Sequence, residues 1–239
     1  DIAYHYNKFK VRNFDICIDI WGADHHGHIA RLKSAMESLD IDSSKLHILL
    51  VQFVRLVKSG EVVRMSKRTG KAIQLSDLLD EVSADSARFL FNIKEPNTKM
   101  DFDLDLAVKE DSQNPVYYVQ YAHARICSIL RSVPDSVREK IEKGNVCLDV
   151  LTSSEERQLI YNMALYTMQI ISCARDFDPT RITKYVIDLA TDFHKFYNAH
   201  KVICDDDEIM LARIYLCICV KIVISNILRL FKISIPERM

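Results

Sequence analysis

The chain contains few of the residues that break helices or form tight turns. Its 239 residues include only five glycines and five prolines. This scarcity argues against a turn-rich all-β fold and favours long helices. Because 49% of the residues are hydrophobic and 27% are charged, the chain can bury a substantial core, as one large domain or two smaller ones.

The chain also lacks an excess of charge of either sign. Residues 1–95 carry 14 basic and 13 acidic side chains, and residues 96–239 carry 18 and 20. Neither part is therefore a broad basic surface of the kind that coats nucleic acid, and we expect no DNA partner. A local basic patch remains compatible with this balance.

No two cysteines have the CxxC spacing of a metal or redox site, and the seven cysteines are scattered. An odd number without framework spacing predicts reduced thiols in a cytoplasmic protein. The apolar run 209–235 is long enough to mimic a membrane span, but four cations interrupt it. Each cation is costly at the centre of a bilayer, so we predict a buried core helix and no membrane partner.

Two neighbouring segments carry the strongest chemical signal. Residues 63–71 place four cations beside serine, threonine and glycine, a composition suited to closing over a polyphosphate, although a solvated basic turn has it too. Upstream, Phe14–Trp21 is predicted to be a strand, Gly22–His28 a loop and Ile29–Leu39 a helix. In a parallel sheet such a loop lies at the carboxyl end of the strand, where ligands bind.

The remainder is predicted to be mainly helical. The run His47–Val57 is compatible with strand or helix, and Asp101–Leu106 alternates like a short extended segment. Ser76, and Ser83 or Asp85, are expected helix N-caps, and Thr152 with Glu155 is expected to form a capping box. Amphipathic patterns predict helices at 77–82, 83–91, 114–131, 134–145, 152–177, 182–203 and from 207 onward.

The loop Gly22–His28 contains four potential metal ligands, namely Asp24, His25, His26 and His28. A loop this short does not easily aim all four at one ion, and no second cluster completes a site, so we expect no metal. Two alternatives stay open. The histidines could be structural, or they could donate to a ligand whose hydroxyl groups donate to Asp24.

Six segments, in order, resemble arginyl-tRNA synthetase, a class I aminoacyl-tRNA synthetase. They are Gly22–His28, Met65–Gly70, Asp101–Leu106, Asn114–Arg125, Phe193–Asn198 and Pro236–Met239. The resemblance implies an α/β part followed by an all-α part. It implies a partial Rossmann-like nucleotide-binding half with the Met-Ser-Lys loop at 1–74, a connecting helical segment at 75–110 and a helical-bundle anticodon-binding domain at 111–239.

The resemblance also implies a tRNA-contacting domain and a catalytic half with a HIGH motif before Asp1. His25–His28 fits His-x-Gly-His, yet it lies too close to the Met-Ser-Lys loop to be that motif. It also follows Trp-Gly-Ala-Asp, which is typical of a later strand of the catalytic domain. We therefore expect this chain to be a C-terminal portion that is inactive alone.

The resemblance implies roles for individual residues of the active site. Lys67 is the expected catalytic residue, because its ammonium would stabilise the pyrophosphate leaving group. Arg68 replaces the final serine of the loop pattern, and Arg64 replaces its first lysine. The expected ATP-binding residues are Gly22, Asp24, His28, Arg64, Met65 and Ser66. Asp1 and His25 are expected to bind arginine. For Asp1 the reason is that a carboxylate pairs well with a guanidinium.

Anticodon reading is implied for Tyr118, Tyr121, Tyr197 and Met239. Unpaired bases are recognised by stacking on aromatic rings and by hydrogen bonds to their edges. Core packing is an equal alternative for Tyr118 and Tyr121. Lys201 occupies a position at which some members of the family have an aromatic residue, and a phosphate contact is the alternative there.

The implied activity is that of an arginine–tRNA ligase. ATP and L-arginine would form arginyl-adenylate, and the arginyl group would pass to tRNA(Arg). Magnesium would accompany ATP as a substrate, and no tightly bound cofactor is expected. Two alternatives stay open: a non-catalytic tRNA-binding module, and a class I synthetase for another amino acid such as cysteine, which shares the helical domain type.

Overall fold

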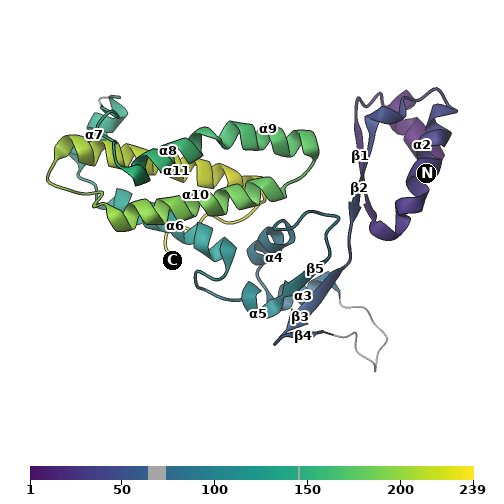
Figure 1. The fold of residues 1–239 in the computed structure, drawn as a ribbon, viewed down its shortest axis with the longest axis horizontal. Helices are drawn as coiled ribbons and strands as arrows, with labels where there is room; N and C mark the ends of the chain where they lie inside the picture. Colours follow the sequence, from purple (N-terminus) through teal and green to yellow (C-terminus); the bar gives the residue numbers. More distant parts are fainter. Residues whose placement is uncertain (64–73, 145) are drawn as a thin grey trace. The chain divides into compact units, whose positions relative to one another are not determined.

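The computed structural model describes residues 1–63, 74–144 and 146–239, and the elements are labelled in Figure 1. These residues form two compact units. The first comprises Asp1–Val57 and Lys94–Phe102, and the second comprises Lys58–Ile93 and Asp103–Met239. An α/β part followed by an all-α part is confirmed. The domain limits expected after residues 74 and 110 stay a prediction.

The first unit is built on two parallel strands, β1 (Cys17–Gly22) and β2 (Leu46–Val51), which pair along their full length. The chain passes between them through helix α2 (Ile29–Glu37), preceded by a 3-10 segment at Ala23–His28 and followed by another at Ser43–Lys45. The expected strand–loop–helix unit is therefore confirmed. Two parallel strands place the loop after β1 at the carboxyl edge of the sheet.

The N-terminal helix is fastened to β1 by a charged cluster. Helix α1 (Ile2–Tyr6) continues into a π-helical turn at Asn7–Val11. Nε2 of His5 lies 2.6 Å from one carboxylate oxygen of Asp19 on β1, and Nζ of Lys8 donates to the other at 2.9 Å. Burial alone would raise the pKa of Asp19, but the hydrogen bonds from Lys8 and His5 outweigh it and lower this pKa. The cluster thus fixes the position of Asp1, whose carbonyl accepts from Nδ1 of His5 at 2.8 Å.

A three-stranded sheet follows, in the order β4 (Glu61–Val62), β3 (Val54–Lys58), β5 (Met100–Asp103). The run 47–57 is therefore strand, divided between β2 and β3. Only the first three residues of the expected extended segment at 101–106 lie in β5. The remainder enters the short helix α5 (Leu104–Ala107), because the side chain of Asp103 caps the Leu106 amide at 3.0 Å.

Two short helices precede the bundle, α3 (Leu75–Glu81) and α4 (Ala84–Phe91). Ser83 caps α4 as expected, accepting from the Ser86 amide at 3.1 Å. The expected cap of α3 at Ser76 is wrong. Gln74 caps that helix, because Asp77 closes a capping box with the Gln74 amide at 3.0 Å.

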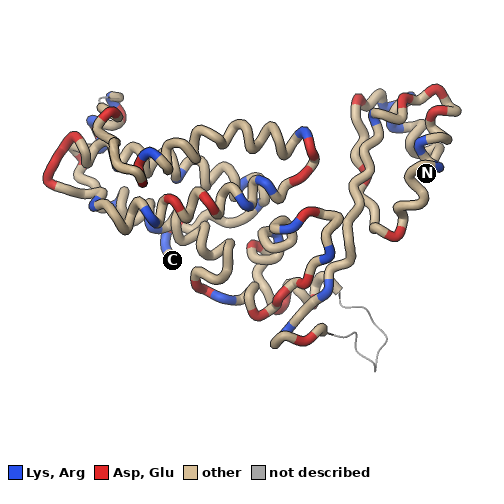
Figure 2. Tube along the Cα trace, viewed as in Figure 1, with Lys and Arg blue, Asp and Glu red and all other residues tan. Residues whose placement is uncertain are grey.

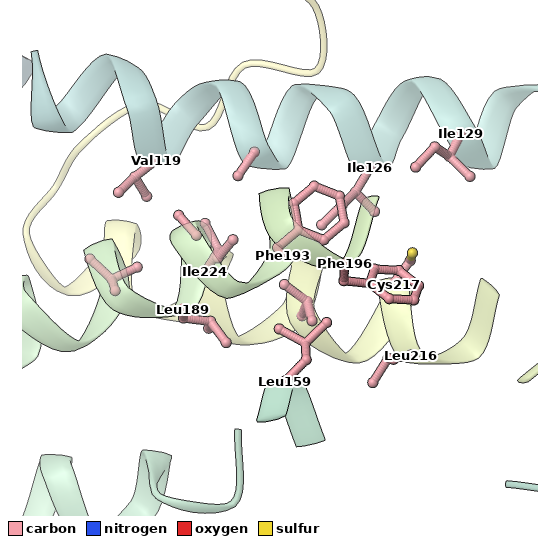
Figure 3. Packing of buried hydrophobic residues seen from close by; sticks show 14 of the residues in the cluster. Val119, Ile126, Ile129, Leu159, Leu189, Phe193, Phe196, Leu216, Cys217 and Ile224 are labelled. Carbon is pink, nitrogen blue, oxygen red and sulfur yellow. The ribbon is translucent and has the colours of Figure 1, made fainter. Parts of the chain in front are cut away.

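Six further helices form the bundle. They are α6 (Pro115–Arg131), α7 (Asp135–Glu142), α8 (Ser154–Ala164), α9 (Tyr166–Asp176), α10 (Thr180–Ala199) and α11 (Asp207–Leu230). Their apolar faces meet in one core, in which α6, α10 and α11 supply most of the buried side chains (Figure 3). The labelled side chains in Figure 3 include Val119 and Ile126 of α6, Phe193 and Phe196 of α10, and Cys217 and Ile224 of α11. Each fully buried large side chain contributes about 1.5–3 kcal/mol by its removal from water.

The expected capping box at Thr152 and Glu155 is one residue too early. Ser153 and Glu156 form it, and the helix expected to reach 177 is divided at Leu165 into α8 and α9. Tertiary structure selects this register, because the Glu156 carboxylate accepts from the Ser153 amide at 2.9 Å and from Arg213 on α11 at 2.8 Å.

The apolar run near the C-terminus forms the central helix α11. By length and composition alone α11 would suffice to cross a membrane, but 56% of its most apolar window is buried inside the bundle. Arg213, one of the interrupting cations, pairs with the buried Glu156 within the bundle. The expectation of a core helix is confirmed. All seven cysteines are free.

Candidate functional site

The loop after β1 brings together the residues of the first unit that were expected to bind ATP and arginine. Nε2 of His28 lies 3.5 Å from Oδ2 of Asp1, and Nε2 of His25 lies 3.8 Å from Oδ2 of Asp24. The Trp21 ring flanks both histidines, at centroid distances of 5.6 Å from His28 and 6.4 Å from His25. All four polar side chains are exposed. They form an open polar surface at the carboxyl edge of β1, where hydroxyl and guanidinium groups can be hydrogen-bonded.

Gly22 leaves room for the Asp24 carboxylate, and its backbone conformation does not itself require glycine. Its φ of −63° and ψ of 145° are extended values that any residue adopts. A Cβ atom there would lie 2.5 Å from Oδ1 of Asp24, which is too close for any real contact. A larger residue would therefore turn the Asp24 carboxylate away from its place beside the loop. The approach of a ligand to Gly22 stays a prediction.

The remaining active-site candidates, Arg64, Met65, Ser66 and Lys67, lie outside the described residues, and their roles stay predictions. Within residues 1–63, 74–144 and 146–239, no group of three or more His, Cys, Asp and Glu side chains is placed to hold a metal ion.

A second site lies wholly within the helical unit. A hollow of about 920 Å³ opens between α6, the end of α10 and the segment after α11. Tyr121 on α6, Tyr197 on α10 and Met239 all line it, so the structure brings together three of the four residues expected to read an anticodon. We call this hollow the C-terminal groove. Its principal polar and aromatic lining residues are Tyr121, Arg125, Arg131, Tyr197, Lys201 and Arg238, and Met239 adds an apolar side chain.

Arg125 lies between the two tyrosines of the groove. Its guanidinium carbon is 4.6 Å from the ring centroid of Tyr121 and 4.6 Å from that of Tyr197. One guanidinium nitrogen also donates to the Tyr121 hydroxyl at 2.6 Å. A cation stacked on an aromatic face contributes about 0.5–2 kcal/mol, according to exposure. Arg125 therefore holds both rings in place.

The C-terminal groove is basic. Arg131, Lys201 and Arg238 line it with Arg125, and no acidic residue is among the lining residues that the structure describes. Arg213 holds the backbone of Lys201 in place beside the groove, because its guanidinium donates to the Lys201 carbonyl at 2.9 Å. Elsewhere cations and anions are interspersed along both units (Figure 2). A local basic hollow with aromatic faces combines the two features that single-stranded nucleic acid requires.

Tyr118, the fourth expected residue, faces a neighbouring hollow of about 530 Å³ together with Tyr117, Tyr121 and His194. Its ring centroid lies 4.7 Å from that of His194, and it also packs against the bundle core. Burial, with a smaller effect from Arg125, lowers the pKa of His194. Nε2 of this histidine is buried without a hydrogen-bond partner among the described residues. Tyr118 therefore lies at the border between core and groove.

The sequence pattern assigned no role to Arg125, although the segment Asn114–Arg125 contains it. The signal was available, because Tyr121 and Arg125 are four residues apart and share one face of a helix. Nothing in the sequence pattern marks Arg131 or Arg238 as groove residues. Arg131 ends α6, whereas the place of Arg238 follows from the path of the chain after α11.

A helical bundle with a basic, aromatic groove, joined to a parallel βα unit, has the make-up of an RNA-reading domain attached to a nucleotide-binding fold. The chain belongs to the family of the DALR anticodon binding domain, whose family model matches residues 119–239.

Curated relatives match over the whole chain. The arginine–tRNA ligase of Caldanaerobacter subterraneus is 50% identical over 240 residues, and that of Ruminiclostridium cellulolyticum is 49% identical over 240. Each match covers 100% of this chain and 42% of the relative, so the chain spans about two-fifths of their length.

Solved structures agree with this. The arginyl-tRNA synthetase structure from Campylobacter jejuni has a TM-score of 0.83 and 35% identity, covering 100% of this chain and 51% of that one. The arginyl-tRNA synthetase from Plasmodium falciparum has a TM-score of 0.79, covering 100% of this chain and 44% of that one; at 20% identity it shows a shared fold.

Proposed function

We propose that this chain is the C-terminal portion of an arginine–tRNA ligase, and that its C-terminal groove binds the anticodon loop of tRNA(Arg). The observation that carries this proposal is Arg125, held between the rings of Tyr121 and Tyr197 at the basic opening. Bases that leave the RNA stack can stack on the aromatic rings there, and the phosphates between them can pair with the cations. Met239 adds an apolar contact at the rim of the same hollow.

In the parent enzyme, ATP and L-arginine form arginyl-adenylate, and the arginyl group passes to the terminal adenosine of tRNA(Arg). The first unit contributes the β1 loop, in which Asp24 accepts from hydroxyl groups and His25 and His28 donate. Asp1 supplies a carboxylate to the substrate guanidinium. Lys67 neutralises charge on the departing pyrophosphate, and magnesium accompanies ATP. Positioning and charge stabilisation supply most of the catalysis.

This chain by itself binds RNA without activating arginine. Its β1 loop offers only exposed contacts, and the chain spans 42% of its ligase relatives. The test is ATP–pyrophosphate exchange with arginine and tRNA(Arg). No exchange above background is expected, whereas clear turnover by this chain would show that its own residues suffice.

RNA recognition is tested with fluorescently labelled hairpins that carry the anticodon stem and loop of tRNA(Arg) or of tRNA(Cys). Fluorescence anisotropy measures the dissociation constant of each at several salt concentrations. We expect tighter binding of the arginine hairpin and an affinity that falls with salt, because phosphate contacts release counterions. Equal affinity for the two hairpins would reject anticodon reading and favour a non-selective RNA-binding module. Preference for the cysteine hairpin would favour a synthetase for that amino acid.

A further inference from the structure

The segment that follows α11, residues 232–239, runs across the bundle without regular secondary structure and reaches the C-terminal groove. Ile233 is buried and its amide donates to the Leu228 carbonyl at 2.9 Å, which anchors the start of the segment. Arg238 and Met239 line the groove at its other end, yet both side chains are exposed. Apolar burial therefore does not by itself determine where the last two residues lie.

A polar cluster, of which Gln120 is the buried member, holds the middle of the segment at Ser234. The Ser234 amide donates to the two carboxylate oxygens of Asp85 at 3.1 and 3.2 Å, and the Ser234 hydroxyl donates to the same carboxylate. Nε2 of Gln120, on α6, donates to Oδ2 of Asp85 and to the Ser234 carbonyl, each at 3.1 Å. Gln120 is only 8% exposed, so its amide depends on these partners.

Three further side chains hold carbonyl groups of the segment. Arg88 donates to the Lys232 carbonyl at 3.1 Å, and Nδ1 of His123 donates to the Pro236 carbonyl at 2.9 Å. Arg131 donates to the Glu237 carbonyl at 3.0 Å. Asp85 and Arg88 share one face of α4 and the other donors share one face of α6. The segment is thus bound to two helices largely through its backbone.

We propose that Asp85 and Gln120 are positioning residues for the C-terminal groove. By fixing Ser234 they determine where Arg238 and Met239 stand relative to Tyr121 and Tyr197. This positioning role rests on the proposed function, because that function assigns the groove to RNA. The role goes beyond the proposed function, because Asp85 belongs to α4 and lies outside the matched family range 119–239. Helix α4 therefore contributes to the shape of the groove that binds RNA.

The first test does not involve RNA. Carboxypeptidase releases Met239 at a rate set by how often the segment detaches from the bundle. Loss of a charge-assisted hydrogen bond is expected to raise this rate about tenfold or more in Asp85→Ala. Asp80→Ala removes an exposed carboxylate from neighbouring α3 and is the matched control, with an unchanged rate expected. Gln120→Met, which keeps the volume but removes both donations, serves as the second variant if Asp85→Ala unfolds α4.

Release of Met239 at the wild-type rate from both folded variants would overturn the proposal. Circular dichroism establishes that each variant keeps the helical bundle. A rate that rises equally in the Asp80→Ala control would also overturn it, because the effect would then reflect loss of charge rather than loss of the Ser234 contacts.

The second test is a double-mutant cycle with the arginine anticodon hairpin. Asp85→Ala is expected to weaken binding several-fold in the full chain, but to have no further effect once Arg238 and Met239 are deleted. Additive losses would overturn the positioning role, since Asp85 would then act elsewhere. If the unmodified chain fails to bind the hairpin, the proposed function fails, and the carboxypeptidase rates still decide whether Asp85 and Gln120 hold the segment.

Discussion

The guanidinium of Arg125, on α6, lies 4.6 Å from the ring centroid of Tyr197, on α10. Direct packing between these two helices makes the contact possible, since Val119 and Ile126 of α6 share a core with Phe193 and Phe196 of α10. Packing between the core faces of both helices thus determines which side chains meet in the groove. Arg125 belongs to the groove because of contacts made on the other side of its own helix.

Replacement of Arg125 by lysine is expected to weaken hairpin binding about three- to thirtyfold. Lysine keeps the charge but loses the planar cation that stacks on both tyrosines and the donation to the Tyr121 hydroxyl. Anisotropy titration measures the effect. Arg175→Lys is the matched control, because Arg175 is exposed on α9 and pairs with Asp176. Equal affinities for the Arg125→Lys and Arg175→Lys chains would contradict the role of stacking.

Replacement of Tyr197 separates stacking from core packing. Tyr197→Phe keeps the aromatic face and should bind the hairpin nearly as well as the unmodified chain. Tyr197→Leu keeps apolar volume but loses the face, and a loss of about 1–3 kcal/mol in binding free energy is expected. Thermal unfolding of both variants serves as the control. Loss of binding that tracks loss of stability in both variants would show that this half-exposed ring is structural.

The ion pair between Glu156 and Arg213 makes the stability of the bundle depend on pH. Burial alone would raise the pKa of Glu156, but the Ser153 capping contacts and Arg213 outweigh it and lower this pKa. The stabilisation is therefore complete above the pKa of an unfolded glutamate, about 4.3, and is lost as the pH falls through the lower folded value. Arg213→Met should cost about 3–5 kcal/mol at neutral pH, because it leaves a buried carboxylate unpaired.

Urea unfolding between pH 3 and pH 7 measures both effects. The Arg213→Met chain should lose less stability on acidification than the unmodified chain, because protonation of Glu156 then relieves an unpaired charge. Lys143→Met removes an exposed cation that pairs with Glu139 and is the control, with little change expected. Parallel pH profiles for the unmodified and Arg213→Met chains would rule out a contribution from this pair.

One face of β1 should promote self-association of this chain. Ile18 and Ile20 point to the same side of the strand and are 45% and 70% exposed, and Phe53 after β2 is 72% exposed. Apolar strand faces of this kind pair with other chains. Ile20→Thr keeps the β-branched shape and should lower the apparent mass in sedimentation, whereas Val108→Thr, at an isolated exposed site, should not. A monomeric unmodified chain would contradict the expectation.

Lys67 is tested in the full-length ligase, where the reaction can be followed. Lys67→Ala should slow adenylate formation about a hundredfold or more, as the loss of one donor to developing charge does elsewhere. Lys58→Ala is the control, since Lys58 is exposed and pairs with Glu81 at 2.7 Å. A loss below about threefold on the same scale would remove Lys67 from its assigned role.

Local patterns predicted most of the elements but not their limits. The strand–loop–helix unit around Gly22–His28 and the long helices follow from periodicity and caps, which depend on neighbouring residues. The caps at Gln74 and Ser153 were missed by one or two residues. At Ser153 the reason is a distant partner, since Arg213 on α11 fixes Glu156 and thereby the first turn of α8.

The sequence by itself determined the two-part organisation and indicated Tyr121, Tyr197 and Met239, which the structure gathers in one groove. Tertiary structure alone decided that Arg125 lies between two rings, and that Asp85 of α4 holds the segment ending in Met239. The physical reason is the range of the forces involved. Helix periodicity and capping act within a few residues, whereas stacking and buried hydrogen bonds need partners that only the packed core brings together.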